Sequence, residues 1–437
     1  MSAQRTRTLA LVLPLLLAAG WPQSAPAHKA KLRTLHSFCA ESGCADGREP
    51  SAGLIADGAG NLYGTTLFGG DADVGVAFEL TPNARKTKYK YKRLYSFCAQ
   101  ASCADGNDPD ASLIIDASGN LYGTTMAGGA NDGGVVFELK PGHGTWTYTV
   151  LYSFCASADC ADGREPQSSL SYVGKESGAP YDGSSPLYGT ASQAGANKQG
   201  VAFKLTPGAP LWTEQVLYAF CAVSGCTDGA GPVTGLTVDG SGHLFGTTYY
   251  GGDANMGTVF ALSGGTLTVL HSFCASANCA DGAFPAAAMH LDAQGNLLGT
   301  TFGGGKKGKN CVDIGVGGCG TAFKLSPDAE IALYKFCAKK NCVDGSYPLA
   351  GVLPDAPSGL WGATLYGGGN GDSPGAGTIF KLNGGEQSVY RFCAQADCSD
   401  GENPEGDLIM DASGNVFGTT LFAGANGGGG TVFELMP

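Results

Sequence analysis

Seven copies of one short pattern, Phe-Cys-x4-Cys-x-Asp-Gly, run along this chain. Successive copies lie 53 to 66 residues apart, and they begin at Phe38, Phe97, Phe154, Phe220, Phe273, Phe336 and Phe392. A pattern that recurs at this spacing over almost the whole sequence indicates one tandem array of supersecondary units, not several unrelated domains. The array therefore restricts the fold more than any single motif does.

Each repeat predicts four β-strands. In the second copy they cover residues 111–116, 121–126, 135–139 and 148–154, which are rich in β-branched and aromatic residues and are bounded by Gly, Asp, Asn or Pro. Residues 116–120, Asp-Ala-Ser-Gly-Asn, predict a tight hairpin turn between the first two strands. The repeat is therefore expected to form one antiparallel sheet.

A four-stranded sheet that is apolar on both faces must be covered on both sides, and radial stacking of like sheets does this. The array begins with an isolated fourth strand, residues 32–38, and ends with three strands, residues 407–411, 416–421 and 431–435. An open solenoid would leave a long unpaired edge at each end. We therefore predict an all-β fold, a seven-bladed β-propeller of four-stranded antiparallel blades, closed by the N-terminal strand completing the last blade.

The first residues predict an export signal. Arg5 and Arg7 precede an apolar run over residues 9–19, and Ala25-Pro26-Ala27 offers a cleavage site. The apolar run is too short to span a bilayer, and no later segment is apolar enough, so no membrane span is expected. We assign residues 1–27 to a signal peptide and 28–437 to a single propeller domain, secreted to the extracellular space or periplasm.

Charge excludes one class of partner. Removing residues 1–27 leaves 24 basic against 38 acidic side chains, a formal charge of −14. Nucleic acid is not an expected partner, because binding it requires a positive face. The expected partners are extracellular glycans or proteins, and the protein is expected to be a monomer.

All sixteen cysteines can be paired by position. An even, periodic set in an exported protein predicts disulfides that close short loops, and zinc is disfavoured because no copy carries a second Cys or His pair. The expected pairs are Cys39 with Cys44, Cys98 with Cys103, Cys155 with Cys160, Cys221 with Cys226, Cys274 with Cys279, Cys311 with Cys319, Cys337 with Cys342 and Cys393 with Cys398.

The core string of the repeat resembles a known family. Leu-x-x-Asp-x-x-Gly-Asn-Leu-Tyr-Gly-Thr-Thr, then Gly-Gly and Gly-x-Val-Phe-Glu-Leu, is similar to the GloVer tandem repeat of choice-of-anchor tandem repeat proteins, which are exported by bacteria. Close copies stand at residues 114–125 with 134–139 and at 409–420 with 430–435. The resemblance covers residues 32–437 and implies an exported repeat protein, but no particular activity. The group is named for an anchor, and none follows Leu435, so surface attachment is not predicted.

Alternating strand direction places two sets of loops on one rim: the disulfide-closed loops, and the glycine-rich loops between the second and third strands. Asp71, Asp73, Asp132 and Asp253 lie in the glycine-rich loops and could supply oxygen ligands to Ca²⁺. The alternative is that they are ordinary exposed turn residues.

Three lysines, Lys306, Lys307 and Lys309, lie in an enlarged glycine-rich loop over residues 303–320 of the fifth repeat. They predict contact with an anionic ligand, or else a solvated insertion. A second basic stretch, residues 85–93, either protects an edge strand or meets an anionic partner. The third repeat is extended at residues 174–186, on the opposite rim.

No Ser-His-Asp set, metal triad or phosphate loop is evident, and no catalytic residue is predicted. His290, on a first strand, is expected to be buried and hydrogen-bonded.

We therefore predict a binding module for a glycan, cell-envelope or protein ligand. One alternative is an enzyme, a Ca²⁺-dependent hydrolase or lyase with acids at the mouth of the central channel; another is a passive spacer. An enzyme would place unlike polar residues at equivalent inner positions, whereas a repeat binder would repeat near-equivalent pockets.

Overall fold

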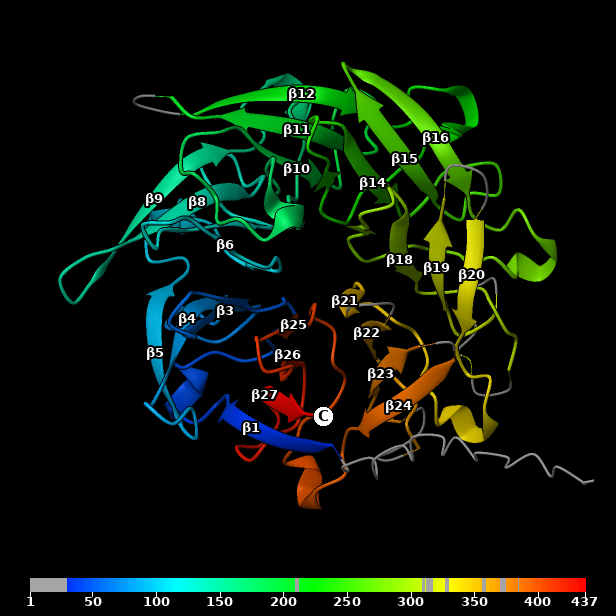
Figure 1. Cartoon of the computed structure of the whole chain (residues 1–437). Coiled ribbons are helices and arrows are strands. Elements are labelled where there is room, and N and C mark those ends of the chain that lie inside the picture. The colour runs from blue at the N-terminus through cyan, green and yellow to red at the C-terminus, as the bar shows by residue number, and fades with distance from the viewer. Residues whose placement is uncertain are drawn as a thin grey trace, which may run out of the picture.

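Seven small sheets are arranged radially around a central axis (Figure 1). The computed structural model describes residues 30–208, 212–308, 311, 317–326, 330–355, 359–369, 375–383 and 385–437. The predicted seven-bladed propeller is confirmed. The predicted signal peptide lies outside the described residues.

The blades follow one another along the chain, and within each the strands run from the axis outward. The first to third blades contain β2 (Ile55–Ala56), β3 (Leu62–Thr66), β4 (Val76–Pro82) and β5 (Tyr89–Ser96); β6 (Ile114–Ile115), β7 (Leu121–Thr125), β8 (Val135–Pro141) and β9 (Trp146–Ser153); and β10 (Leu187–Ala191), β11 (Val201–Thr206) and β12 (Thr213–Ala219). The fourth to sixth contain β13 (Thr237–Val238), β14 (Leu244–Thr248), β15 (Thr258–Ser263) and β16 (Thr266–Ser272); β17 (His290–Leu291), β18 (Leu297–Thr301), β19 (Thr321–Leu325) and β20 (Glu330–Lys335); and β21 (Leu353–Asp355), β22 (Gly359–Thr364), β23 (Thr378–Leu382) and β24 (Glu386–Arg391).

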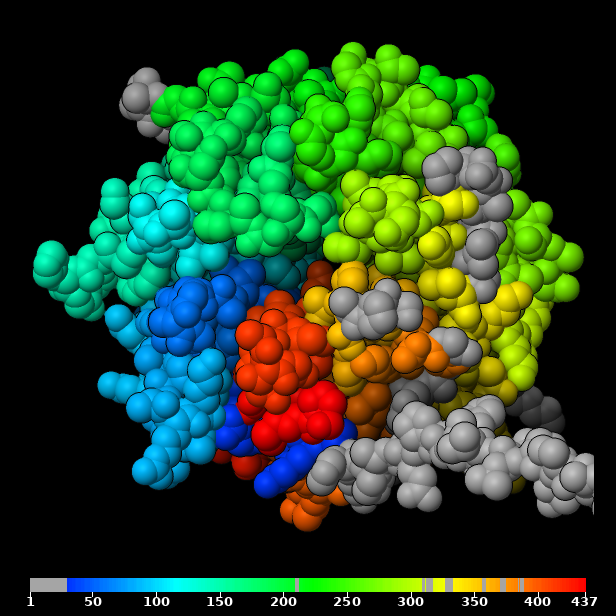
Figure 2. Space-filling model, in the orientation of Figure 1, coloured from blue at the N-terminus to red at the C-terminus, as the bar shows by residue number. Residues whose placement is uncertain are grey.

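The seventh blade joins the two ends of the described chain. It contains β25 (Ile409–Met410), β26 (Val416–Thr420), β27 (Thr431–Met436) and, as its outer strand, β1 (Lys31–Ser37). The strands β1 and β27 pair antiparallel, from Lys31 opposite Met436 to Ser37 opposite Thr431. In the space-filling view the N-terminal segment lies against the C-terminal one (Figure 2). The predicted closure of the ring by the N-terminal strand is confirmed.

The turn chemistry follows the sequence prediction. The Asp57 carboxylate accepts the N–H groups of Ala59 and Asn61, both at 2.9 Å, and the Asn61 amide at 2.8 Å. Gly60 in this turn has φ +85°, a conformation that glycine adopts without a steric penalty. The same side-chain and backbone bonds recur at Asp116, Asp292 and Asp411, so the hairpin turn is encoded locally.

Two details differ from the prediction. The innermost strands are two or three residues long where the sequence predicted about six, because only that part of each segment pairs with its neighbour. In the third blade the innermost strand is reduced to a single bridge between Ser171 and Tyr188, since the chain leaves the sheet directly afterwards to form an insertion. Among the described residues, no helix is long and apolar enough to cross a membrane.

Candidate functional site

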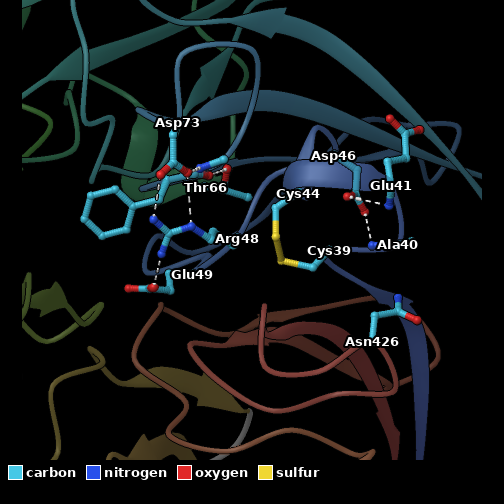
Figure 3. Close-up of a disulfide and its surroundings, with 12 residues drawn as sticks. Cys39, Ala40, Glu41, Cys44, Asp46, Arg48, Glu49, Thr66, Asp73 and Asn426 are labelled. Atoms are coloured by element: carbon cyan, nitrogen blue, oxygen red, sulfur yellow. Dashed lines mark hydrogen bonds and ion pairs between the residues drawn. A yellow bond between two sulfur atoms is a disulfide. The ribbon is translucent and has the colours of Figure 1, made fainter.

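The disulfide-closed loops, which we call the stapled loops, each connect the outer strand of one blade to the next blade. In the first, the Asp46 carboxylate accepts the N–H groups of Ala40 and Glu41, both at 3.1 Å (Figure 3). It also contacts His36 Nε2 at 3.0 Å. Burial raises the pKa of the Asp46 carboxyl, but these hydrogen bonds outweigh it and leave that pKa below its usual value. The repeated Asp of the motif is therefore a structural cap for its loop.

All sixteen cysteines form disulfides, in the pairs expected from the sequence. The bridges that close the seven stapled loops join Cys39 to Cys44, Cys98 to Cys103, Cys155 to Cys160, Cys221 to Cys226, Cys274 to Cys279, Cys337 to Cys342 and Cys393 to Cys398. The eighth bridge joins Cys311 to Cys319 and closes the enlarged loop of the fifth blade. The predicted disulfides are therefore confirmed in every repeat.

The glycine-rich loops lie directly beside the stapled loops. The Gly70 N–H donates to the Cys44 carbonyl at 3.0 Å, and the Gly252 N–H donates to the Cys226 carbonyl at 3.0 Å. The Gly305 N–H donates in the same way to the Cys279 carbonyl at 2.8 Å. The predicted sharing of one rim, here called the stapled rim, is confirmed.

Replacing Cys98 and Cys103 together by serine is expected to lower the free energy of unfolding by about 2 kcal/mol, because so short a loop restricts the unfolded chain only a little. Urea unfolding under non-reducing conditions measures the change. The same double replacement at Cys155 and Cys160 is the matched control and should give the same loss. A loss above about 4 kcal/mol at either site would mean that the bridges secure the fold as well as the loop shape.

The aspartates considered for calcium are mostly engaged with arginines. Asp73 accepts Arg48 Nε at 3.1 Å and Nη2 at 3.0 Å (Figure 3), and Asp71 accepts Arg93 at 2.8 and 3.2 Å. Asp132 lies 3.5 Å from Arg164. The Asp253 backbone N–H donates to a serine hydroxyl at 3.2 Å, on the same rim. These four aspartates come from three different blades and do not gather at one point.

Within the described residues, the only groups of three metal-ligating side chains contain disulfide cysteines: Cys311, Cys319 and Cys337, and Cys393 and Cys398 with Glu402. Calcium binding at the glycine-rich loops stays a prediction. Of the predicted anion-contacting lysines, Lys306 and Lys307 are exposed on the stapled rim. Lys309 lies outside the described residues.

A left-handed residue directs each stapled loop toward the axis. The residue before the proline that follows the Asp-Gly pair has φ between +57° and +60° in every repeat; it is a non-glycine residue in six of them, as at Asp108, and Gly231 in the fourth. Its N–H donates to the preceding blade, from Asp108 to the Val74 carbonyl at 3.0 Å, and its carbonyl accepts the Met126 N–H at 3.0 Å. A left-handed non-glycine residue costs energy and persists only where its surroundings fix it. The next residues are thereby held at the central channel.

The mouth of the channel on the stapled rim is a cavity of about 490 Å³. Each blade contributes residues from the segment that leads into its innermost strand. The first residue after the proline lines the cavity in every blade, as Ser51, Asp110, Gln167, Val233, Ala286, Leu349 and Glu405. The third residue forms a deeper ring of Gly53, Ser112, Ser169, Gly235, Ala288 and Asp407. The mouth is therefore built from equivalent positions filled by unlike residues.

Polar and apolar residues occupy opposite halves of this mouth. Glu405, Ser51, Asp110 and Gln167 come from four consecutive blades, the seventh, first, second and third. The remaining three blades supply Val233, Ala286 and Leu349, together with Tyr249 and Tyr250. The pseudo-symmetry of the propeller is thus broken where the seven blades meet.

The aromatic side of the mouth is fixed by stacking. The Tyr249 ring lies 5.0 Å from the Phe284 ring at an interplanar angle of 20°, and it contacts Tyr250 edge-on at 4.8 Å. Tyr250 leaves 48% of its surface exposed. An exposed ring on a rigid support is a suitable platform for a flat ligand face.

The carboxyls on the polar side are surrounded by protein but open to the channel. Burial raises the pKa of Asp110 to about 6, although the Ser51 hydroxyl, which donates to its carboxylate, opposes the shift and the Asp108 charge adds to it. Burial and the charge of Asp110 raise the pKa of Glu405 to about 7. Like charges that share a poorly solvated space disfavour simultaneous ionisation. The two groups are therefore poised to bind or exchange protons near neutral pH.

The third-repeat insertion lies across the opposite end of the channel, where a cavity of about 1010 Å³ is lined by Lys175, Glu176 and His290. The Lys175 ammonium donates to the Leu170 carbonyl at 3.1 Å, and Glu176 lies 3.1 Å from His290 Nδ1. His290 has Glu176 as an ion-pair partner, but 27% of its side chain is exposed, so the expected burial was wrong. His290 lies at the edge of this cavity, so its side chain stays in contact with solvent.

Asp407 lies between the two ends. The Gly351 N–H donates to its carboxylate at 2.7 Å. Burial raises the Asp407 pKa, although this hydrogen bond and the Lys175 charge oppose the shift. Burial lowers the pKa of Lys175, which the charges of Glu176 and Asp407 partly offset. The charges of Lys175 and Asp407 therefore favour each other's ionised forms.

Sequence reasoning did not identify Asp110, Glu405 or Asp407. The alternative hypothesis placed unspecified acids at the channel mouth, and the structure supplies these three. A partial signal was present: after Asp-Gly-x-x-Pro the seven repeats read Ser, Asp, Gln, Val, Ala, Leu and Glu, between a constant proline and a position held by small residues. The two positions before the proline vary as well, so this variation alone did not distinguish the channel residues.

Comparison of structures finds propellers of low sequence similarity. The β-propeller domain of Cps50 (Swd1) from Myceliophteria thermophila is 11% identical, with 92% of this chain and 99% of that one covered and a TM-score of 0.50. The β-propeller domain of the Trilobed protease from Pyrococcus furiosus is 6% identical, with 90% and 94% covered and a TM-score of 0.42. The similarity to the Cps50 (Swd1) domain shows the fold alone.

A comparison with curated proteins finds no match. A family model does match the sequence, over residues 24–184 and again over residues 171–312, which together cover most of the chain. The repeats within these ranges carry the stapled loops, the hairpin turns and the strand order described above. The chain belongs to the Gloeobacter/Verrucomicrobia repeat family.

Proposed function

We propose that this protein is an exported binding protein that holds one saccharide ligand at the mouth of its central channel, on the stapled rim. The broken symmetry of the mouth argues for one site in place of seven, and it is also what the enzyme alternative predicts, so catalysis is the second candidate. A protein that bound through its repeats would keep seven similar pockets, whereas here four polar residues face three apolar ones and a tyrosine pair across one cavity. Such an arrangement suits a single, oriented ligand.

Saccharides match the chemistry of the two halves. Their hydroxyl groups both donate and accept hydrogen bonds, as required by Asp110, Gln167 and Glu405. Their C–H faces pack against exposed aromatic rings such as Tyr250. The rigid loops around the mouth reduce the ordering cost of binding. The eight disulfides support an oxidising, extracytoplasmic location, which would also expose the protein to glycans.

The proposal predicts a stoichiometry of one ligand per chain. A glycan array would identify candidate ligands, and calorimetric titration of each hit would give the stoichiometry. Asp110→Asn and Gln167→Ala should each weaken binding about 10-fold or more, since each removes a hydrogen bond within a partly desolvated site. Asp253→Asn is the matched control: it lies on the same rim outside the channel, and it should bind like the native protein. Seven ligands per chain, or equal losses in the control, would contradict the channel site.

The raised pKa values of Asp110 and Glu405 favour one second candidate, acid–base hydrolysis of the bound saccharide. Two carboxyls near the operating pH can serve as general acid and general base. In that case the native protein would release reducing ends from a bound oligosaccharide, with a bell-shaped pH profile that Glu405→Gln abolishes. Binding without product release would leave the protein a binding module. No ligand in either assay would favour a passive spacer.

A further inference from the structure

We infer that a lysine-lined pocket on the stapled rim, between the fifth and sixth blades, is a second binding site that takes oxyanion groups of an acidic polysaccharide. The pocket has a volume of about 320 Å³. Lys306 and Lys307 from the glycine-rich loop of the fifth blade line it, together with Lys339 and Lys340 from the next stapled loop. The site does not depend on the proposed channel function.

Two separate basic segments are brought together here. The Lys306 ammonium donates to the Ala338 carbonyl at 3.1 Å and so joins the two loops, and all four lysines are exposed. In the other six repeats the four residues between the stapled-loop cysteines include no lysine or arginine. Positive charge is therefore concentrated in one of seven equivalent places, in a protein whose net charge is −12.

Disulfides make the base of the pocket rigid. The extra bridge Cys311–Cys319 belongs to this loop alone, and the Sγ atoms of Cys311, Cys319 and Cys337 lie within 4.8 Å of one another. Both this bridge and the one between Cys337 and Cys342 pack into one apolar cluster that includes Tyr347. The backbone under the lysines is thus fixed, while their long side chains can adjust to a ligand. A merely solvated insertion would not need this support.

The chemistry points to oxyanions carried on a flexible chain. Lysine ammonium groups act as point charges and do not impose the bidentate geometry of arginine, so they accept carboxylate, sulfate or phosphate esters alike. A single free anion would gain little from exposed lysines, because such pairs are weak. A polymer with repeated charges keeps several lysines occupied at once and gains from effective concentration. Nucleic acid is disfavoured, since a pocket of four lysines in a protein with a net charge of −12 lacks the extended positive face that nucleic acid requires.

The test is the binding of soluble polymers to the full-length secreted protein, measured by calorimetry at low and at physiological salt. The probes are heparin for sulfate, polygalacturonate for carboxylate, a phosphomannan for phosphate and dextran as the neutral control. At least one acidic polysaccharide should bind, dextran should not, and salt should weaken the binding. The variant K306Q/K307Q/K339Q/K340Q should lose about 30-fold in affinity, from four exposed ion pairs.

A matched variant separates this pocket from general charge. K86Q/K88Q/K90Q/K92Q removes four lysines from the outer edge of the first blade and makes the same change in net charge. It should bind the acidic polymer like the native protein. The inference would be overturned by an equal loss of affinity in this variant or by unchanged affinity in the pocket variant. It would also be overturned if polyglutamate, an acidic polymer that is not a polysaccharide, bound as tightly as the acidic polysaccharides.

The saccharide site in the channel and the lysine-lined pocket can be tested independently of each other. Gln167→Ala should leave acidic-polymer binding unchanged, and the pocket variant should leave binding of the channel ligand unchanged. Thermal unfolding of each variant confirms that it is folded. The four lysines are exposed, so replacing them should change the melting temperature little.

Discussion

A chain that lacks residues 30–38 is expected to lose at least about 4 kcal/mol of unfolding free energy and to associate with itself. The deletion removes β1, the outer strand of the seventh blade, and leaves the β27 edge unpaired. It also removes Phe38, which is fully buried and packs 5.2 Å from Phe78 of the first blade. Both the last sheet and its contact with the first would be incomplete.

Urea unfolding and light scattering measure the two effects. A synthetic peptide of residues 30–38, added in excess, should restore stability by pairing with the free edge. Phe154→Ala is the matched control, since it creates a similar cavity between covalently continuous blades and should lower stability without causing association. A truncated chain that is as stable as the full one, and monomeric, would show that the ring does not need its closing strand.

The fold could be predicted because its signals are local and repeated. Four of the hairpin turns are specified by an Asp, a Gly and an Asn within five residues, as at Asp57, Gly60 and Asn61. The isolated strand before Phe38 and the missing fourth strand after Leu435 together indicated closure. The Phe-Cys-x4-Cys-x-Asp-Gly pattern appears seven times, so one irregular copy does not obscure the repeat.

The channel residues could not be located in the same way. Periodicity does not apply to innermost strands only two or three residues long. Whether the Glu405 side chain faces the axis depends on how the left-handed residue before Pro404 turns the chain. That turn is fixed by hydrogen bonds from the preceding blade, such as the one from Asn403 to the Ala376 carbonyl, which exist only in the closed ring. The third-repeat insertion was visible as extra sequence, but its position over the channel involves contacts with other blades, such as Glu176 with His290 and the Tyr181 N–H with the Ile115 carbonyl.

Glu405→Gln is expected to stabilise the protein at pH 8 and to weaken saccharide binding at the same time. Its pKa is raised from 4.5 to about 7 in the folded protein, so the folded state holds the proton more tightly than the unfolded chain does. Stability therefore falls as pH rises from about 4.5 to about 7, and it remains lower above that range. Glutamine carries no charge to desolvate, so the Glu405→Gln protein should have a free energy of unfolding about 1–2 kcal/mol higher than the native protein at pH 8. This gain is smaller than the full pKa shift implies, because water in the channel screens the carboxylate.

Thermal unfolding at pH 4 and pH 8 tests the sign. Native protein and Glu405→Gln should differ little at pH 4, where the glutamate is protonated, and should diverge at pH 8. Asp182→Asn is a control in which the change in stability should have the opposite sign. Hydrogen bonds from Ser185 and Ser184 lower the pKa of this exposed carboxyl to about 2. Its replacement should therefore destabilise the protein at pH 8. A residue that costs stability but contributes to binding is typical of a functional site. If Glu405→Gln instead destabilised the protein at pH 8, its carboxylate would have a stabilising partner, and the polar half of the mouth would be structural.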